Sequence, residues 1–281
     1  MTFSWSHPSL HVVPLILGAG LIVWYLEATW KEGFRASKGQ RIGFLLGVGL
    51  LVLVLSWPLA DLALHVSLLL LVLQRLALVL GVAPLLLFGI PATVAARLTR
   101  PRIIDFLARN LSRPFMALAS TTAILALTAL PWSVEWAGRN GAVHALMLFA
   151  VLCAGVILWL PVIERVPGVQ GLKPMVKAAY LVGQAVAPTF LSFIWIFALR
   201  PLYGSLSGQH DALGISPLTD QQLAGYLAKL VTFGVLLPAT YVVMVRADED
   251  TDESTRPLHW IDVERELERA QRRNRPIDPE E

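Results

Sequence analysis

One long apolar stretch, from His65 to Pro91, constrains the fold of this chain more than any other feature. It has the length that an α-helix needs to cross a lipid bilayer, about 20 residues or a few more. Its middle holds one full charge, Arg75, next to Gln74. A charge at that depth costs at least about 2.5 kcal/mol on insertion scales, so Arg75 is expected to face protein or a water-filled cavity rather than lipid.

The composition of the whole chain agrees with this stretch. Of its 281 residues, 56% are hydrophobic and 15% are charged, whereas roughly 25% of the residues in a soluble domain are charged. The net charge of +3 comes from basic residues spread over loops without interleaved aromatics, which argues against nucleic acid as a partner. The single cysteine, Cys153, excludes an internal disulfide and a metal site built on paired cysteines. We predict an all-α, polytopic membrane protein.

Seven apolar segments predict a bundle of seven membrane-spanning helices. They are expected at residues 9–27, 42–60, 65–91, 114–131, 143–163, 175–199 and 223–245. Between the third and fourth spans, residues 105–111 are expected to form a short helix at the membrane surface. The chain then divides into a membrane domain, 1–246, and a charged tail, 247–281. The tail opens with an acidic segment of disordered composition and is expected to continue as a short charged helix.

The distribution of basic residues predicts the orientation of this bundle. Of the 23 Lys and Arg residues, nineteen fall on the side of the C-terminus and two on the opposite side, while Arg75 and Lys229 lie inside spans. Loops rich in Lys and Arg stay in the cytoplasm. The N-terminus is therefore expected outside the cell and the C-terminus in the cytoplasm.

With that orientation, five of the six histidines fall at the outer face. Neutral imidazole is a common copper and zinc ligand, and thioether sulfur favours Cu(I). The side chains that could form an outer copper site are those of His7, His11, His65, His144 and Met147. The alternative is that the histidines only sit at the membrane interface, where their polar tips stay in water.

The two cations inside spans indicate a different kind of site. Arg75 is expected about 15 Å below His65, and Lys229 about 9 Å below Leu223. If their helices are neighbours, the space between them is electropositive, which favours a carboxylate, an anionic lipid head group or a haem propionate over a metal ion. The alternative is a structural polar network. Its expected members are Arg75, Gln74, Lys229, Asp220, Gln221 and Asp61, with Asp61, Asp220 and Glu135 as the acids that could neutralise the cations.

No catalytic motif stands out in the sequence. It contains no phosphate-binding loop, no Gly-x-Ser-x-Gly turn and no His-Glu-x-x-His pair. We therefore do not expect an enzyme. A transporter is also disfavoured, because the hydropathy pattern has no inverted repeat.

Several stretches, taken in order, are similar to the CtaG family of cytochrome c oxidase assembly factors from bacteria with caa-type oxidases. They are Gln-Arg at 74–75, APLLLFGIP at 83–91, HALMLFAVLCAGVILWLPVI at 144–163, RPLYG at 200–204, DQQLAG at 220–225 and the tail around Trp260. The resemblance covers nearly the whole chain. It implies a seven-helix bacterial plasma-membrane protein that helps to deliver copper to a haem-copper oxidase, with oxidase subunits as partners.

The chain departs from the family pattern where the resemblance would place metal ligands. For the family's His-Met-x-Gln-His in the third span it has Leu71 and Arg75, with Gln74 kept. Of a His-x-x-Glu-His pattern only His144 remains, and Lys229 stands where a tryptophan is usual. Two hypotheses follow: an assembly factor that handles Cu(I) at the outer face, or a metal-free accessory subunit of a respiratory complex that uses the two cations for ionic, lipid or cofactor contacts.

Overall fold

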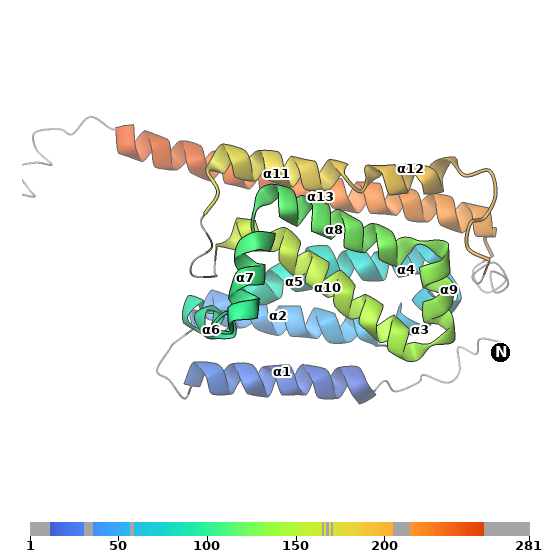
Figure 1. The fold of residues 1–281 in the computed structure, drawn as a ribbon, viewed down its shortest axis with the longest axis horizontal. Helices are drawn as coiled ribbons and strands as arrows, with labels where there is room; N and C mark the ends of the chain where they lie inside the picture. Colours follow the sequence, from blue (N-terminus) through green and yellow to red (C-terminus); the bar gives the residue numbers. More distant parts are fainter. Residues whose placement is uncertain are drawn as a thin grey trace, which may run out of the picture.

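The computed structural model describes residues 12–30, 36–56, 59–164, 166, 169, 171–204 and 214–255. Over these residues the chain forms helices and no strand, so the all-α prediction is confirmed. Figure 1 shows the long helices side by side along one common direction, with α13 (Pro217–Thr255) running along the bundle. His7 and His11 lie outside the described residues, as do the side chains of Asp61 and His65.

The first two spans pack against each other at one edge of the bundle. α1 (Val12–Trp30) lies along α2 (Lys38–Leu55). The ring of Tyr25 stacks on that of Phe44 with centroids 4.0 Å apart, and the Tyr25 hydroxyl donates a hydrogen bond of 3.0 Å to the carbonyl of Gly89. Most of the remaining surface of α1 is exposed, which suits a helix whose other faces meet lipid.

The third span consists of three helical pieces in series. They are α4 (Leu68–Leu76), a π-helical segment (Ala77–Val82) and α5 (Ala83–Gly89). The main apolar core of the bundle forms around them, with side chains from α2, α8, α10, α11 and α13. The span ends before Pro91, as the Gly-x-Pro sequence predicts.

The segment that follows turns sharply before the next long helix. α6 (Ala92–Leu98) and α7 (Arg102–Leu111) precede α8 (Pro114–Ala129), and α7 meets α8 at 98°. α7 buries none of its residues and exposes apolar side chains such as Ile103 and Phe106 beside charged ones. A helix is therefore present where one was expected at residues 105–111, and it begins slightly earlier, at Arg102. Its two-faced character is typical of a helix in the membrane interface, which stays a prediction.

The second half of the chain completes the bundle. It contains α9 (Pro131–Arg139), α10 (Gly141–Ile163), α11 (Pro174–Val186) and α12 (Thr189–Phe197). The short helix α3 (Leu59–His65) lies earlier in the chain, just before α4. α9 lies against both α3 and α10 at one end of the bundle (Figure 1). α11 and α12 form a single span that is broken where a proline follows α11.

α13 continues beyond the predicted end of the last span. We expected the span to end near residue 245 and an acidic disordered segment to follow, but the helix runs to Thr255. The reason lies in helix cooperativity. Contacts with α4, α11 and α12 already fix the first part of α13, and lengthening an existing helix orders only one residue for each new hydrogen bond.

The chain is a multi-pass membrane protein with six or seven spans. Six segments are long and apolar enough to cross a bilayer, at 12–29, 38–55, 68–89, 141–163, 174–197 and 217–247. The remaining predicted span, α8, has 16 residues and is therefore about 24 Å long, against an apolar core of about 30 Å. It counts as a seventh span only together with α7.

Candidate functional site

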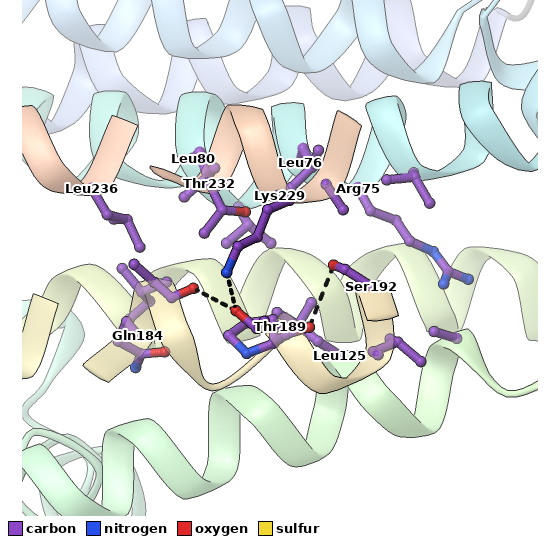
Figure 2. A pocket seen from close by; sticks show the side chains of 18 of the residues that line it. Arg75, Leu76, Leu80, Leu125, Gln184, Thr189, Ser192, Lys229, Thr232 and Leu236 are labelled. Carbon is purple, nitrogen blue, oxygen red and sulfur yellow. Dashed lines mark hydrogen bonds between the residues drawn. The ribbon is translucent and has the colours of Figure 1, made fainter. Parts of the chain in front are cut away.

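A cavity of about 80 Å³ lies inside the bundle, and both intramembrane cations line it (Figure 2). An apolar wall with a few polar groups is typical of a binding site. The lining residues come from α4, the π-helical segment, α8, α10, α11, α12 and α13. They are Val72, Arg75, Leu76, Val79, Leu80, Leu125, Ala129, Leu158, Gln184, Ala185, Pro188, Thr189, Leu191, Ser192, Trp195, Ala228, Lys229, Thr232 and Leu236.

A proline follows the π-helical segment at one wall of this cavity and leaves one of its carbonyls without a helical partner. A π-helix pairs each carbonyl with the N–H five residues later, and for Val79 that residue is Pro84, which has no N–H. The carbonyl of Val79 instead accepts a hydrogen bond of 3.0 Å from the indole of Trp159. Gly155 on α10 makes the approach possible, because a Cβ there would lie 2.8 Å from the Cα of Val79.

A second proline breaks the opposite wall. Pro188 lacks an N–H, and its ring clashes with the carbonyl four residues earlier, so α11 ends at Val186 and α12 begins at Thr189. Pro188 itself lines the cavity. Breaks of this kind are tolerated in membrane helices where other protein groups or a cavity satisfy the freed backbone. Both irregular turns therefore border the same space.

Arg75 reaches across from α4 to the end of α8. Its Nη2 donates a hydrogen bond of 2.8 Å to the carbonyl of Thr128. That carbonyl belongs to the last turn of α8, where helix carbonyls have no partner within the helix. A positive charge at a helix C-terminus also interacts favourably with the helix dipole. Arg75 thus faces the interior of the bundle.

Lys229 projects from α13 toward α12. Its Nζ donates a hydrogen bond of 2.5 Å to Oγ1 of Thr189 and lies 3.9 Å from the ring centroid of Phe233 and 5.7 Å from that of Phe193. Phe193 is 46% exposed, so the ammonium group sits close to the outer surface of α12 and α13. Figure 2 shows that Lys229 and Arg75 point toward opposite ends of the cavity.

The two cations nevertheless lie at similar depth, because Asp220 ties the starts of α4 and α13 together. Its carboxylate accepts hydrogen bonds of 2.6 Å from the hydroxyl of Ser67 and from the backbone N–H of Leu68. Counting from this shared level, Arg75 lies about 10 Å along α4 and Lys229 about 14 Å along α13.

The acids that we expected near the cations are placed elsewhere. Asp220 caps α4, and Glu135 lies 4.0 Å from Arg139, one turn along α9. The side chain of Asp61 lies outside the described residues. Within the part of the chain that the structure describes, no carboxylate forms an ion pair with either cation.

The glutamines divide between the scaffold and the cavity. Gln74 donates a hydrogen bond of 2.9 Å to a carbonyl of α2, and Gln221 accepts one of 2.8 Å from the N–H of Leu202. Gln184 is 1% exposed and lines the cavity. Its amide nitrogen donates to the hydroxyl of Tyr180 at 2.9 Å, while its side-chain oxygen has no partner among the described residues.

Tyr203 and Trp195 support the Arg75 end of the cavity, and sequence analysis did not single out either of them. The Tyr203 hydroxyl donates a hydrogen bond of 2.6 Å to the carbonyl of Ala129 and accepts one of 2.9 Å from the Trp195 indole. Burial raises the pKa of Tyr203, and the hydrogen bond from Trp195 and the charge of Arg75 lower it by less. The only sequence signal was RPLYG, which the family resemblance includes.

Of the five candidate copper ligands, His144 and Met147 and the backbone of His65 lie at one end of the bundle. His144 and Met147 lie on one face of the first turns of α10, and both are half-buried. α3, which ends at His65, lies at the same end (Figure 1). Among the described residues, no three side chains of His, Cys, Asp or Glu are grouped as they would be around a metal ion. His7 and His11 fall outside that part of the chain.

The size of the cavity limits what it can hold. An apolar cavity of roughly 150 Å³ holds a benzene molecule, so 80 Å³ accommodates a carboxyl group with a short apolar stem. Two unneutralised cations disfavour a metal cation in the same space. The geometry therefore supports the binding of a small anionic group.

Comparison with known protein families gives a match over most of the chain. The model of a family described as cytochrome c oxidase caa3 assembly factor matches residues 16–248. No curated protein and no solved structure matches the chain at a significant level.

Proposed function

The chain belongs to the family of caa3-type cytochrome c oxidase assembly factors, and from this premise we propose that it is a non-enzymatic membrane protein that assists the assembly of a haem-copper oxidase. We place it in a bacterial plasma membrane, with oxidase subunits as its partners. The cavity between Arg75 and Lys229 supports a role in holding a partner, because it presents two cations that no acid neutralises within the described residues.

The observation that carries this proposal is that neither Arg75 nor Lys229 has a carboxylate partner among the described residues. Removing one partner of a buried ion pair costs about 3–5 kcal/mol, because a charge is left uncompensated in a medium of low dielectric constant. Arg75 has one carbonyl and Lys229 one hydroxyl and two aromatic rings as partners. Each cation is held in place by these contacts, but its full charge stays available to a binding partner.

Deletion of the gene in its host tests the assembly role. We expect membranes of the deletion strain to contain less assembled oxidase, measured by oxidase activity and by the amount of complex on native gels. Complementation with the unaltered gene should restore both. Complementation with Arg75→Leu together with Lys229→Met should not, although the variant protein is present in the membrane. Normal oxidase levels in the deletion strain would contradict the proposal.

Copper handling at the outer end is the second candidate function. It is favoured by His144 and Met147 on one face of α10, at the end of the bundle where α3 finishes with His65. In this case His7 and His11 would complete the site.

Cu(I) binding under reducing conditions tests that candidate. Purified protein should bind about one equivalent, and His144→Ala should abolish binding. His259→Ala, in the C-terminal tail, serves as the matched control and should leave binding unchanged. Equal binding by both variants would reject the His144 site, and the absence of bound copper in the unaltered protein would reject copper handling.

A further inference from the structure

The polar groups of the cavity form an incomplete set. Lys229 donates one hydrogen bond, to Thr189, although an ammonium group can donate three. Among the described residues, Lys229 therefore keeps two N–H donors without a hydrogen-bond acceptor. Unsatisfied polar groups within the apolar thickness of a membrane cost several kcal/mol each. The ammonium group is therefore suited to an acceptor that comes from outside the chain.

Lys229 is the cation that an outside partner can reach. Phe193, which lies 5.7 Å from its ammonium group, is 46% exposed, and the next residue on α13, Leu230, is 71% exposed. Arg75 instead donates its hydrogen bond to the carbonyl of Thr128 at the end of α8, deep in the bundle. Lys229 thus stands at the outer side of the cavity, while Arg75 adds positive potential from the far end.

The surface around Lys229 is suited to another helix. Phe190 and Phe197 on α12 are 75% and 73% exposed, and with Phe193 and Leu230 they form an apolar face beside the cation. Either a lipid chain or an apolar helix could pack against these exposed apolar side chains. The charge decides between them, because an ion pair inside the apolar core is available to a helix that carries a carboxylate at the depth of Lys229, about 14 Å along α13 from Asp220.

We propose that Lys229 pairs with one carboxylate, from an Asp or Glu side chain, on a transmembrane helix of the partner that this chain helps to assemble. The helix packs against α12 and α13, and its carboxyl group enters the cavity, which has room for that group and a short stem. This inference rests on the proposed assembly function. It names the chemistry of the partner, namely a membrane helix with one intramembrane acid, and the cation that recognises it.

Synthetic transmembrane peptides test the pairing. A labelled peptide of about 22 Leu and Ala residues, with a single Glu at the depth of Lys229, about 14 Å below the level of Asp220, is compared with the same peptide carrying Gln. Binding to the full-length protein in lipid nanodiscs is followed by energy transfer. We expect the Glu peptide to bind about tenfold more tightly than the Gln peptide, the ratio that one interhelical polar contact provides.

Three variants establish whether Lys229 is responsible. Lys229→Met should abolish the preference for Glu, and Lys229→Arg should retain most of it. Lys173→Met, at the start of α11 and outside the cavity, should leave it unchanged. The thermal transition of each variant in detergent shows that it is folded. A preference that survives in Lys229→Met, or no preference in the unaltered protein, overturns the proposal.

A fatty acid of matched length separates a protein partner from a lipid. If it binds with the same dependence on Lys229 while the Glu peptide does not, the site belongs to a lipid carboxylate and the proposal is wrong. The assembly function is judged separately, by oxidase levels in the deletion strain. Loss of oxidase without a peptide preference would contradict the pairing alone, and a peptide preference with normal oxidase would contradict the assembly role alone.

Discussion

Asp220 and Leu68 stand 152 positions apart in the chain, and the carboxylate of the first accepts a hydrogen bond of 2.6 Å from the backbone N–H of the second. The same carboxylate also accepts a hydrogen bond from the hydroxyl of Ser67. An acid at this position satisfies N–H groups that the first turn of α4 leaves unpaired. It also aligns the start of α4 with the start of α13. As a result, Arg75 and Lys229 lie at similar distances along their helices and line the same cavity.

Replacement of Asp220 by Ala should destabilise the bundle. The hydroxyl of Ser67 and the N–H of Leu68 are buried, and each would lose its partner at a cost of about 1–3 kcal/mol. Asp220→Asn keeps one acceptor oxygen and should lose less. Both variants should lower the thermal midpoint in detergent. The matched control is Asp105→Asn, whose exposed ion pair with Arg109 contributes about 0–1 kcal/mol; an equal drop for Asp105→Asn would contradict this account.

Replacement of Gly89 by Ala should also destabilise the protein. A Cβ at this position would lie 2.5 Å from the backbone nitrogen of Phe44 and 2.6 Å from its Cβ, so α2 and α5 would have to move apart. Such overpacking costs about 1–3 kcal/mol, and the move would also strain the hydrogen bond from Tyr25 to the Gly89 carbonyl. Gly49→Ala is the control, because its Cβ would meet nothing within 4 Å. A thermal midpoint that falls equally in both variants would refute the close-packing explanation.

The spans themselves were predictable because apolar runs and their flanking charges are local signals. The third span and the helix before α8 follow from sequence that lies within the segment concerned, whereas the break after α11 was not predicted, although Pro188 lies at it. The bend of 98° between α7 and α8 could not be read in this way. It leaves α8 too short to cross the apolar core alone, so the predicted count of seven spans holds only if α7 and α8 are taken together.

The candidate site was predictable only in part. Arg75 and Lys229 stood out as charges inside spans, but the choice of their partners depends on contacts between segments far apart in sequence. Asp220 carries the charge expected of a counter-ion, yet it caps α4 instead. Thr128 and Thr189 have no distinguishing pattern, and they became visible as partners only once α8 and α12 were placed beside the cavity.

Tyr203 should make the stability of the protein depend on alkaline pH. Burial raises the pKa of its hydroxyl above the ordinary value near 10, so the folded state holds this proton more tightly than the unfolded state. The contribution is fully present below pH 10 and is lost as the pH rises from there through the folded pKa. The difference in thermal midpoint between the unaltered protein and Tyr203→Phe should therefore shrink above pH 10.

Below pH 9, Tyr203→Phe should be the less stable protein. It leaves the carbonyl of Ala129 and the indole N–H of Trp195 without their hydrogen-bond partner, at about 1–3 kcal/mol for each buried group. Tyr226→Phe, whose side chain is exposed on α13, is the matched control. A midpoint difference for Tyr203→Phe that stays constant between pH 8 and 11 would show that the hydroxyl does not titrate as proposed.

The orientation of the bundle can be tested with cysteines, because the chain has only Cys153. In a Cys153→Ala background, Arg139→Cys and Arg100→Cys place one thiol at each end of the bundle, in exposed positions of the described structure. The excess of Lys and Arg around α6 and α7 predicts that this end is cytoplasmic. A membrane-impermeant maleimide should therefore label Arg139→Cys in intact cells and Arg100→Cys only after permeabilisation. The reverse pattern would place the start of α10, with His144, in the cytoplasm, and a copper site there could not serve the outer face of an oxidase.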